Sequence, residues 1–263
     1  MKTLKDRYED IGPRWRQDFG SIRRPDMYDK FLSIIVPGLN FDFKNIKILG
    51  LMAGDAGFEL YFANHLVGLN KRVELDILDF SPTMLEITES TENIALRKII
   101  GDVRYTKIED KYDFVILKFG LHDLPREDQL LVLQNIPQLM PENGRLILIT
   151  YFSSTSETQI HYNNIVELKD KLAGYESERH FATLGESIDA LIKTSLKPRI
   201  EMLSESKINY FRTELLDSRS QKAFNVKLFQ MNIFAGTDNL LGIVHTAEGP
   251  EITFPLAVLT ARI

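Results

Sequence analysis

The sequence predicts a single α/β domain with a doubly wound, mostly parallel sheet. Between residues 41 and 152, short apolar runs alternate with segments whose apolar residues recur at helical spacing. The run 114–117 is apolar at every position, which is typical of a strand buried on both faces. Residues 240–263 instead read as a hairpin. The alternation favours a parallel sheet covered by helices on both faces, and the hairpin predicts an antiparallel closing strand.

Residues 1–40 are expected to form an N-terminal helical cap. Gly12-Pro13 breaks the first helical segment. Pro25 suits the first turn of a second helix, in which apolar residues recur from Met27 to Ile35. Pro37-Gly38 would end that helix.

Residues 41–155 are expected to form the core of the sheet. The expected strands are 46–51, 73–78, a short one ending at 100, 114–117 and 145–151. Helices are expected at 58–69, after 81 and near 133–140. Ser81 can cap the second of these, with Pro82 at its first position.

Residues 156–239 are expected to form a helical insertion or lid. Ser156 can cap one helix, and apolar residues at helical spacing mark another over 188–196. Segment 197–239 is ambiguous, and 223–234 fits either a helix or a strand. In the closing hairpin, 240–246 and 252–261 are the expected arms around the turn Glu248-Gly249-Pro250.

Composition restricts the function. The sequence has no cysteine, which removes disulfides, thiolate catalysis and cysteine-based zinc sites. The five histidines are scattered, so no metal site is expected. A net charge of −5 argues against a nucleic-acid partner. The charged first ten residues and the lack of a long apolar run predict a cytoplasmic protein without a membrane partner.

A loop of small residues follows the first expected strand, from Gly50 to Gly57. Such a loop lets the backbone approach a ligand closely. The second strand ends at Asp79, 22 positions after Gly57, where a carboxylate can accept hydrogen bonds from both hydroxyls of a ribose. A nicotinamide fingerprint would need a glycine where Met52 stands, so that alternative fails.

Further motifs follow in order along the chain. They are Asp79-Phe80-Ser81-Pro82-Thr83-Met84-Leu85, Gly101-Asp102-Val103-Arg104, 112–125, and 139–146. With these motifs the chain resembles the class I methyltransferases that use S-adenosylmethionine (SAM), and is most similar to their small-molecule group, which includes the ubiquinone/menaquinone-type enzymes. The resemblance covers roughly 45–152 and extends to the closing strand. It implies a Rossmann-like fold.

The resemblance also implies a SAM site. The residues implied are Met52, Ala53, Gly54, Asp55, Ala56, Asp79, Phe80, Asp102, Val103, Lys118 and Phe119. Residues 52–56 would face the methionine part of SAM. Asp79 would hold the ribose and Phe80 would pack on the adenine. Asp102 and Val103 would meet the adenine edge, while Lys118 and Phe119 would lie beneath the reacting sulfur.

The sequence departs from the family pattern in the first loop. Gly50 stands where the family has an acidic residue, and Met52 and Ala56 replace two loop glycines. Asp55 or Glu59 is a candidate for a nearby carboxylate.

His122 is the candidate general base, because it lies just beyond the fourth strand at the expected ligand-binding edge. The aromatic residues of the cap either line a substrate pocket or pack the cap onto the sheet. They are Tyr8, Trp15, Phe19 and Tyr28. His122 could also contact the substrate.

We therefore expect an enzyme that transfers a methyl group from SAM to a small molecule by in-line displacement on an oxygen, nitrogen or carbon nucleophile. The alternative is a member of the fold that does not methylate and uses the pocket for another reaction or for binding. Residues 156–239 would form a lid, a homodimer surface or both.

Overall fold

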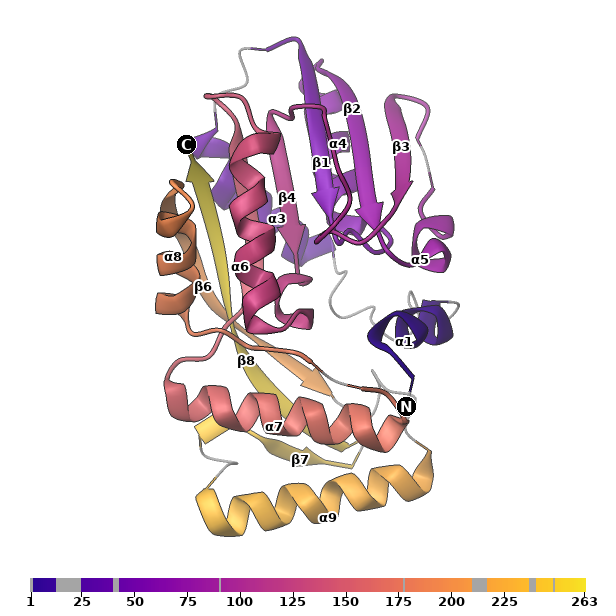
Figure 1. The fold of residues 1–263 in the computed structure, drawn as a ribbon, viewed down its shortest axis with the longest axis vertical. Helices are drawn as coiled ribbons and strands as arrows, with labels where there is room; N and C mark the ends of the chain where they lie inside the picture. The colour runs from indigo at the N-terminus through magenta and orange to yellow at the C-terminus, as the bar shows by residue number, and fades with distance from the viewer. Residues whose placement is uncertain are drawn as a thin grey trace.

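The computed structural model describes residues 2–12, 25–39, 43–89, 91–176, 178–209, 217–236, 240–247 and 249–263. These residues form one eight-stranded sheet with helices on both faces (Figure 1). The strands are β1 (Asn45–Leu51), β2 (Arg72–Asp79), β3 (Ile94–Ile100), β4 (Phe114–Lys118), β5 (Arg145–Tyr151), β6 (Lys197–Asn209), β7 (Val244–Thr246) and β8 (Gly249–Arg262).

The order of the strands across the sheet is β3-β2-β1-β4-β5-β8-β6, with β7 paired to β8. The first five in this order are parallel. β8 is antiparallel to β5, β6 and β7. The predicted Rossmann-like sheet with an antiparallel closing strand is thus confirmed. Because strand order reverses between β1 and β4, the loops at the C-terminal ends of the parallel strands surround the expected ligand position.

Helices cover both faces of the sheet. The helical segments are α1 (Leu4–Ile11), α3 (Pro25–Ile35), η3 (Val36–Gly38), α4 (Gly57–Gly68), α5 (Pro82–Glu86), η4 (Leu121–Asp123), α6 (Arg126–Asn135), η5 (Ile136–Leu139), α7 (Ser156–Ala173), α8 (Leu184–Lys193) and α9 (Ser218–Ala235). Buried side chains of α3, α4, α7 and α9 join one hydrophobic core, and those of α6 and α8 join the other.

β4 shows how the sequence builds these two cores. Phe114 and Ile116 point into the first core, whereas Val115 and Leu117 point into the second. All four are buried. The continuous apolar run therefore identifies a central strand, as predicted.

The first N-terminal helix ends, and the second begins, close to the predicted positions. α1 begins after Thr3, whose side chain accepts a hydrogen bond from Asp6, and Gly12 follows its last residue. α3 begins at Pro25. α1 lies beside α5, near the ends of β1 and β2, rather than over the middle of the sheet (Figure 1).

The segment after β5 differs from the prediction in three details. Thr155, not Ser156, caps α7, because its hydroxyl accepts from the amide of Thr158. Residues 197–209 form the strand β6, so the insertion is not helical throughout. The first arm of the hairpin is only the three-residue β7. Residues 223–234, which fitted either structure, belong to the helix α9.

Candidate functional site

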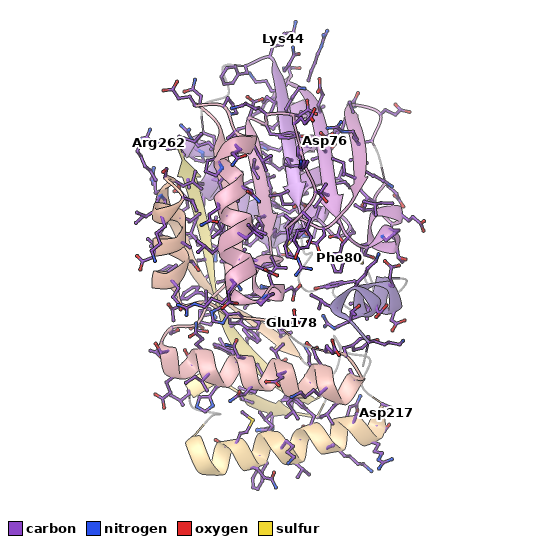
Figure 2. The ribbon with its side chains drawn as sticks, viewed as in Figure 1. Lys44, Asp76, Phe80, Glu178, Asp217 and Arg262 are labelled. Carbon is purple, nitrogen blue, oxygen red and sulfur yellow. The ribbon has the colours of Figure 1, made fainter. Side chains whose placement is uncertain are left out.

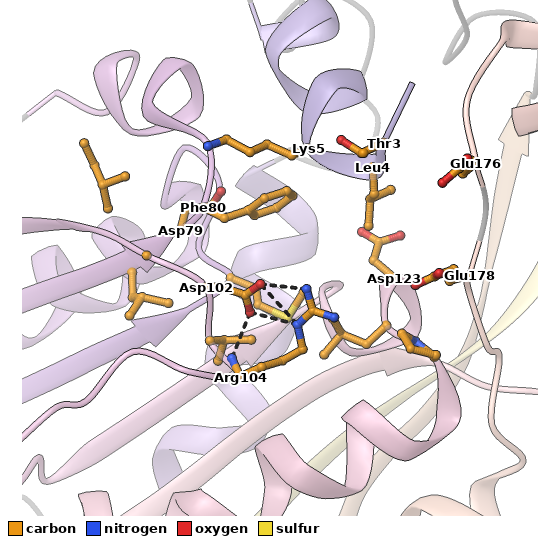
Figure 3. A pocket seen from close by; sticks show the side chains of 17 residues that line it. Thr3, Leu4, Lys5, Asp79, Phe80, Asp102, Arg104, Asp123, Glu176 and Glu178 are labelled. Atoms are coloured by element: carbon orange, nitrogen blue, oxygen red, sulfur yellow. Dashed lines mark hydrogen bonds and ion pairs between the residues drawn. The ribbon is translucent and has the colours of Figure 1, made fainter. Parts of the chain in front are cut away.

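A cavity of ≈ 490 Å³ opens at the C-terminal ends of the parallel strands. Its walls come from α1, the ends of β1 to β3 and the loops that follow them, η4 with the next two residues, and the segment after α7. Phe80 and Glu178 lie on opposite sides of it (Figures 2 and 3). This is the ligand position expected from the topology of the parallel strands.

Of the residues predicted to bind the cofactor, five line this cavity. They are Met52, Asp79, Phe80, Asp102 and Val103. The other six, Ala53, Gly54, Asp55, Ala56, Lys118 and Phe119, are not among the residues that line it. The predicted binding roles of all eleven residues stay predictions.

The β1–α4 loop keeps a glycine-like backbone although two of its expected glycines are replaced. Met52 has φ 51° and Ala56 has φ 54°, beside Gly54 at φ 56°. The left-handed conformation costs an L-residue about 1–2 kcal/mol. The side chain of Met52 lies against Gly120, where an added Cβ would be 2.6 Å from the Met52 Cβ. Packing against the β4 loop thus holds Met52 in this conformation.

Asp79, at the end of β2, is 5% exposed and fixes this loop. One carboxylate oxygen accepts from the amide of Gly54 at 2.8 Å, and the other accepts from the amide of Ser81 at 2.9 Å. Burial raises the pKa of Asp79 to about 6, against the opposing effect of these hydrogen bonds. A carboxylate has further lone pairs, so both oxygens can still accept hydrogen bonds from a ligand.

α1 forms one side of the cavity through Thr3, Leu4 and Lys5. Tyr8, one turn further along the helix, packs edge-on against Phe80 with ring centroids 5.8 Å apart. Its hydroxyl donates to Asp123, which also lines the cavity. Tyr8 therefore stands behind the predicted adenine-packing residue.

Asp102 follows β3 and lies in an ion-pair chain at the cavity wall. Its carboxylate accepts from the Arg104 guanidinium at 2.7–3.1 Å and from the Arg104 amide at 2.9 Å (Figure 3). The same guanidinium donates to Asp128, at the start of α6, at 2.6 Å. Burial acts to raise the pKa of Asp102, but the hydrogen bonds from Arg104 keep it below its usual range.

Glu59 in α4 occupies the space beside Gly50. A Cβ on Gly50 would lie 2.8 Å from the Cγ of Glu59. Glu59 is 1% exposed, and its Oε2 has no hydrogen-bond partner among the described residues. Burial raises the pKa of Glu59 to about 7, partly offset by the charge of Lys118. Glu59 therefore places a buried carboxyl group beside Gly50, and its role as the nearby carboxylate stays a prediction.

Lys118 and Phe119 lie at the end of β4. The Lys118 ammonium is 5.7 Å from the ring centroid of Tyr28 and 4.9 Å from that of Phe119. Phe119 has φ 55° and stacks on Tyr151, with centroids 4.6 Å apart. Lys118 therefore points toward α3 and α4, on the side of the sheet where Glu59 lies.

His122 lies in η4, next to the cavity but not in its wall. The residue is 8% exposed, and its ring stacks on Phe181 at 4.8 Å between centroids. Its Nδ1 has no hydrogen-bond partner among the described residues. Burial lowers the pKa of His122, and Asp123 opposes this effect. The ring is therefore neutral at pH 7, the form that a base needs, and its catalytic role stays a prediction.

A buried ionic cluster connects α1, α7 and η4. The Nε of Arg179 is 3.2 Å from an oxygen of Asp123 and 3.3 Å from an oxygen of Asp170. Arg7 of α1 approaches Asp170 at 3.7 Å. Tyr8 donates to Asp123 from the same helix. This cluster fixes the position of α1 over the cavity.

Two of the candidate substrate residues of the cap, Tyr8 and Tyr28, lie in the described part of the chain, and they pack against different aromatic rings. Tyr28 is buried in α3, with its ring centroid 5.5 Å from that of Phe58 and 5.4 Å from that of Tyr61. It thus packs the cap onto α4. Trp15 and Phe19 lie outside the described residues. The substrate role of all four aromatic residues stays a prediction.

Several cavity residues were not among the predicted site residues. They are Thr3, Leu4, Lys5, Leu78, Ile100, Gly101, Arg104, Asp123, Leu124, Pro125, Glu176 and Glu178. The lining contains five acidic side chains and two basic ones, Lys5 and Arg104. Such a wall favours a cationic ligand. The Gly101-Asp102-Val103-Arg104 motif contained a signal for Arg104. The positions of α1, Glu176 and Glu178 instead depend on contacts between residues that are distant in sequence.

No group of three or more His, Cys, Asp or Glu side chains among the described residues could hold a metal ion. No helix in those residues is long and apolar enough to cross a membrane.

The chain matches no family model and no curated protein sequence. It does share its fold with solved structures. A candidate methyltransferase from Bacillus halodurans is 12% identical with a TM-score of 0.70, over 89% of this chain and 97% of that one. A SAM-dependent methyltransferase from Methanosarcina mazei is 11% identical with a TM-score of 0.54, over 87% and 97%. The (4+2)-cyclase SpnF is 10% identical with a TM-score of 0.59, over 98% and 95%. The chain therefore has the fold of the class I methyltransferases.

Proposed function

We propose that this protein is an enzyme that binds SAM in the cavity beside Asp79 and transfers its methyl group to a small molecule. The observation that carries the proposal is the position of Asp79. Its buried carboxylate fastens the β1–α4 loop through Gly54 and faces the cavity at the end of β2. The specific likeness to ubiquinone/menaquinone-type enzymes is part of the proposal.

The residues present fit the cofactor. The lining around Phe80, Ile100, Val103 and Leu124 is apolar and suits an adenine ring. Asp102 is an acceptor for its amino group, and Asp79 is an acceptor for the ribose hydroxyls. The acidic wall suits a ligand that carries a sulfonium and an ammonium group.

Glu59 is the proposed partner of that ammonium group. Its Oε2 is buried without a hydrogen-bond partner among the described residues, beneath the loop that starts at Gly50. Burying an ionised carboxylate without a partner costs free energy, and pairing with a cation reduces that cost.

SAM supplies a sulfonium-bound methyl group, which moves to the acceptor as the carbon–sulfur bond breaks and leaves S-adenosylhomocysteine (SAH). The protein must hold the acceptor in line with that bond and keep water out. α1 closes one side of the cavity, and the Tyr8–Asp123 hydrogen bond holds it there. Where the acceptor carries a proton, neutral His122 would take it.

The likeness to SpnF supports a second candidate, a reaction other than methyl transfer in the same pocket. We also propose that the partner is a small molecule rather than nucleic acid or membrane, that the protein acts in the cytoplasm, and that it forms a homodimer.

Transfer of labelled methyl from SAM separates the two candidates. The purified protein is incubated with methyl-labelled SAM and a small-molecule extract, next to an Asp79→Ala variant. Label that enters a new small molecule with the wild type alone supports methyl transfer. Bound SAM that stays intact while a component of the extract is converted supports the second candidate.

A further inference from the structure

Arg104 connects the wall of the cavity to α6. Its guanidinium donates two hydrogen bonds from Nε to Asp102, at 3.0 and 3.1 Å, and one from Nη2 at 2.7 Å. Its Nη1 donates to Asp128 at 2.6 Å. The fork of the guanidinium is therefore held at both ends, by one carboxylate in the cavity wall and by one in the first turn of α6.

This arrangement fixes what Asp102 can offer to a ligand. An Arg-paired carboxylate is ionised, so it accepts hydrogen bonds and donates none. The bidentate contact also fixes the plane of the carboxylate. Rotation of Asp102 away from the cavity would break these contacts, together with the bond from the Arg104 amide at 2.9 Å.

We infer that Arg104, anchored by Asp128, is a positioning residue that makes Asp102 select a 6-aminopurine over a 6-oxopurine. This inference rests on the proposed function, because it requires the purine of the cofactor to lie beside Asp102. A 6-amino group donates toward the fixed carboxylate. A 6-oxo group places an acceptor against it, which a site built to accept a hydrogen bond rejects.

The test compares SAH with S-inosylhomocysteine, in which a carbonyl replaces the amino group of the purine. Calorimetry gives the dissociation constants of both ligands for the wild type, Arg104→Met, Arg104→Lys and Asp128→Asn. Arg126→Met is the matched control. Arg126, like Asp128, belongs to the first turn of α6, but it pairs with Glu186 at 2.9 Å outside the cavity. Circular dichroism and thermal unfolding check that each variant folds.

We expect the wild type and the control to bind SAH at least tenfold more tightly than S-inosylhomocysteine. Arg104→Met should reduce this ratio about tenfold, mainly by weakening SAH, and Asp128→Asn should reduce it less. Arg104→Lys, which keeps the charge without the fork, should recover part of the ratio and serves if Arg104→Met does not fold.

Two results overturn the inference and differ in what else they remove. Tight SAH binding with an unchanged ratio in all Arg104 and Asp128 variants would reject the positioning role and leave the proposed function standing. A folded wild type that binds neither ligand would reject the proposed function, and the inference with it.

Discussion

The side chain of Glu59 fills the space that a side chain on Gly50 would need. A Cβ on Gly50 would lie 2.8 Å from the Cγ of Glu59 and 3.2 Å from the Cβ of Ala53. The two positions are therefore coupled: the glycine on β1 admits the carboxylate that comes from α4. We expect this carboxyl group, nine positions further along the chain, to take the place of the acidic residue that Gly50 replaces.

This coupling predicts how substitutions at Gly50 and Glu59 change the stability of the protein. Gly50→Ala should destabilise the protein by about 1–3 kcal/mol, because the added methyl overpacks the space beside Glu59. The double variant Gly50→Asp/Glu59→Ala should regain stability and bind SAH, since it returns a carboxylate to the strand and vacates the space. Urea unfolding and calorimetry measure both. Equal stability for Gly50→Ala and the wild type would contradict the coupling.

Glu59 should also make stability depend on pH. Its pKa is raised from 4.5 to about 7 by burial, so the folded protein holds a proton that the unfolded chain has released between these values. The associated stability is present below pH 4.5 and is lost as the pH rises through about 7. Glu59→Gln has no such loss, so its stability relative to the wild type should increase by up to about 3 kcal/mol from pH 4.5 to pH 8.

Urea unfolding at several pH values measures this difference. Glu157→Gln, which changes an exposed glutamate in the first turn of α7, is the control and should follow the wild type. SAH binding at pH 8 should change in the opposite direction, because Glu59→Gln removes the proposed partner of the ammonium group. A variant that gains stability and keeps full affinity would separate Glu59 from the ligand.

The raised pKa of Asp79 predicts that the affinity for the ligand also depends on pH. Its pKa is raised to about 6 by burial, and ribose hydroxyls donate to the ionised form more strongly. SAH should therefore bind about tenfold more weakly at pH 5 than above pH 7. Asp79→Asn should bind weakly at every pH and lose this step. An affinity that is constant from pH 5 to pH 8 would show that Asp79 does not titrate with the site.

Because α1 forms one side of the cavity, a disulfide that links the end of this helix to α5 should slow ligand exchange. A Cβ on Gly12 would lie 3.3 Å from the Cβ of Thr83, close to the separation in a disulfide. Gly12→Cys/Thr83→Cys should form one, with no native cysteine to compete. Because Thr3 to Lys5 line the cavity, the oxidised variant should bind and release SAH at least tenfold more slowly.

Stopped-flow competition with labelled SAH measures these rates before and after reduction. Reduction should restore the rates of the wild type, and each single cysteine variant should match the wild type throughout. Identical rates for the oxidised and reduced forms would mean that the ligand enters by a route that α1 does not control.

Much of the sheet could be predicted because its strands are apolar and its turns contain glycine, proline or asparagine. β4 is the clearest example, since both of its faces are buried. β6 could not be predicted in the same way. Ile200 and Leu203 stay exposed on this edge strand, and charged residues are interspersed along it. Its structure depends on pairing with β8, which lies far away in the sequence.

The candidate site divides in the same way. Asp79, Phe80 and Asp102 could be placed because each follows a predictable strand and the topology brings strand ends together. Arg104 was part of a recognised motif, but its partner Asp128 belongs to another helix. Leu4 and Glu178 reach the cavity through the bonds between Lys2 and Gly174 and between Glu176 and Lys2, which no local pattern indicates.

The central claim is that the cavity beside Asp79 binds the adenosyl cofactor. Calorimetric titration of the purified protein with SAH, next to Asp79→Ala, tests it most directly. Removing the charged acceptor of both ribose hydroxyls should cost about 2–4 kcal/mol. We predict micromolar binding to the wild type and a loss of roughly 30- to 1000-fold in the variant. A folded wild type that does not bind SAH would contradict the account.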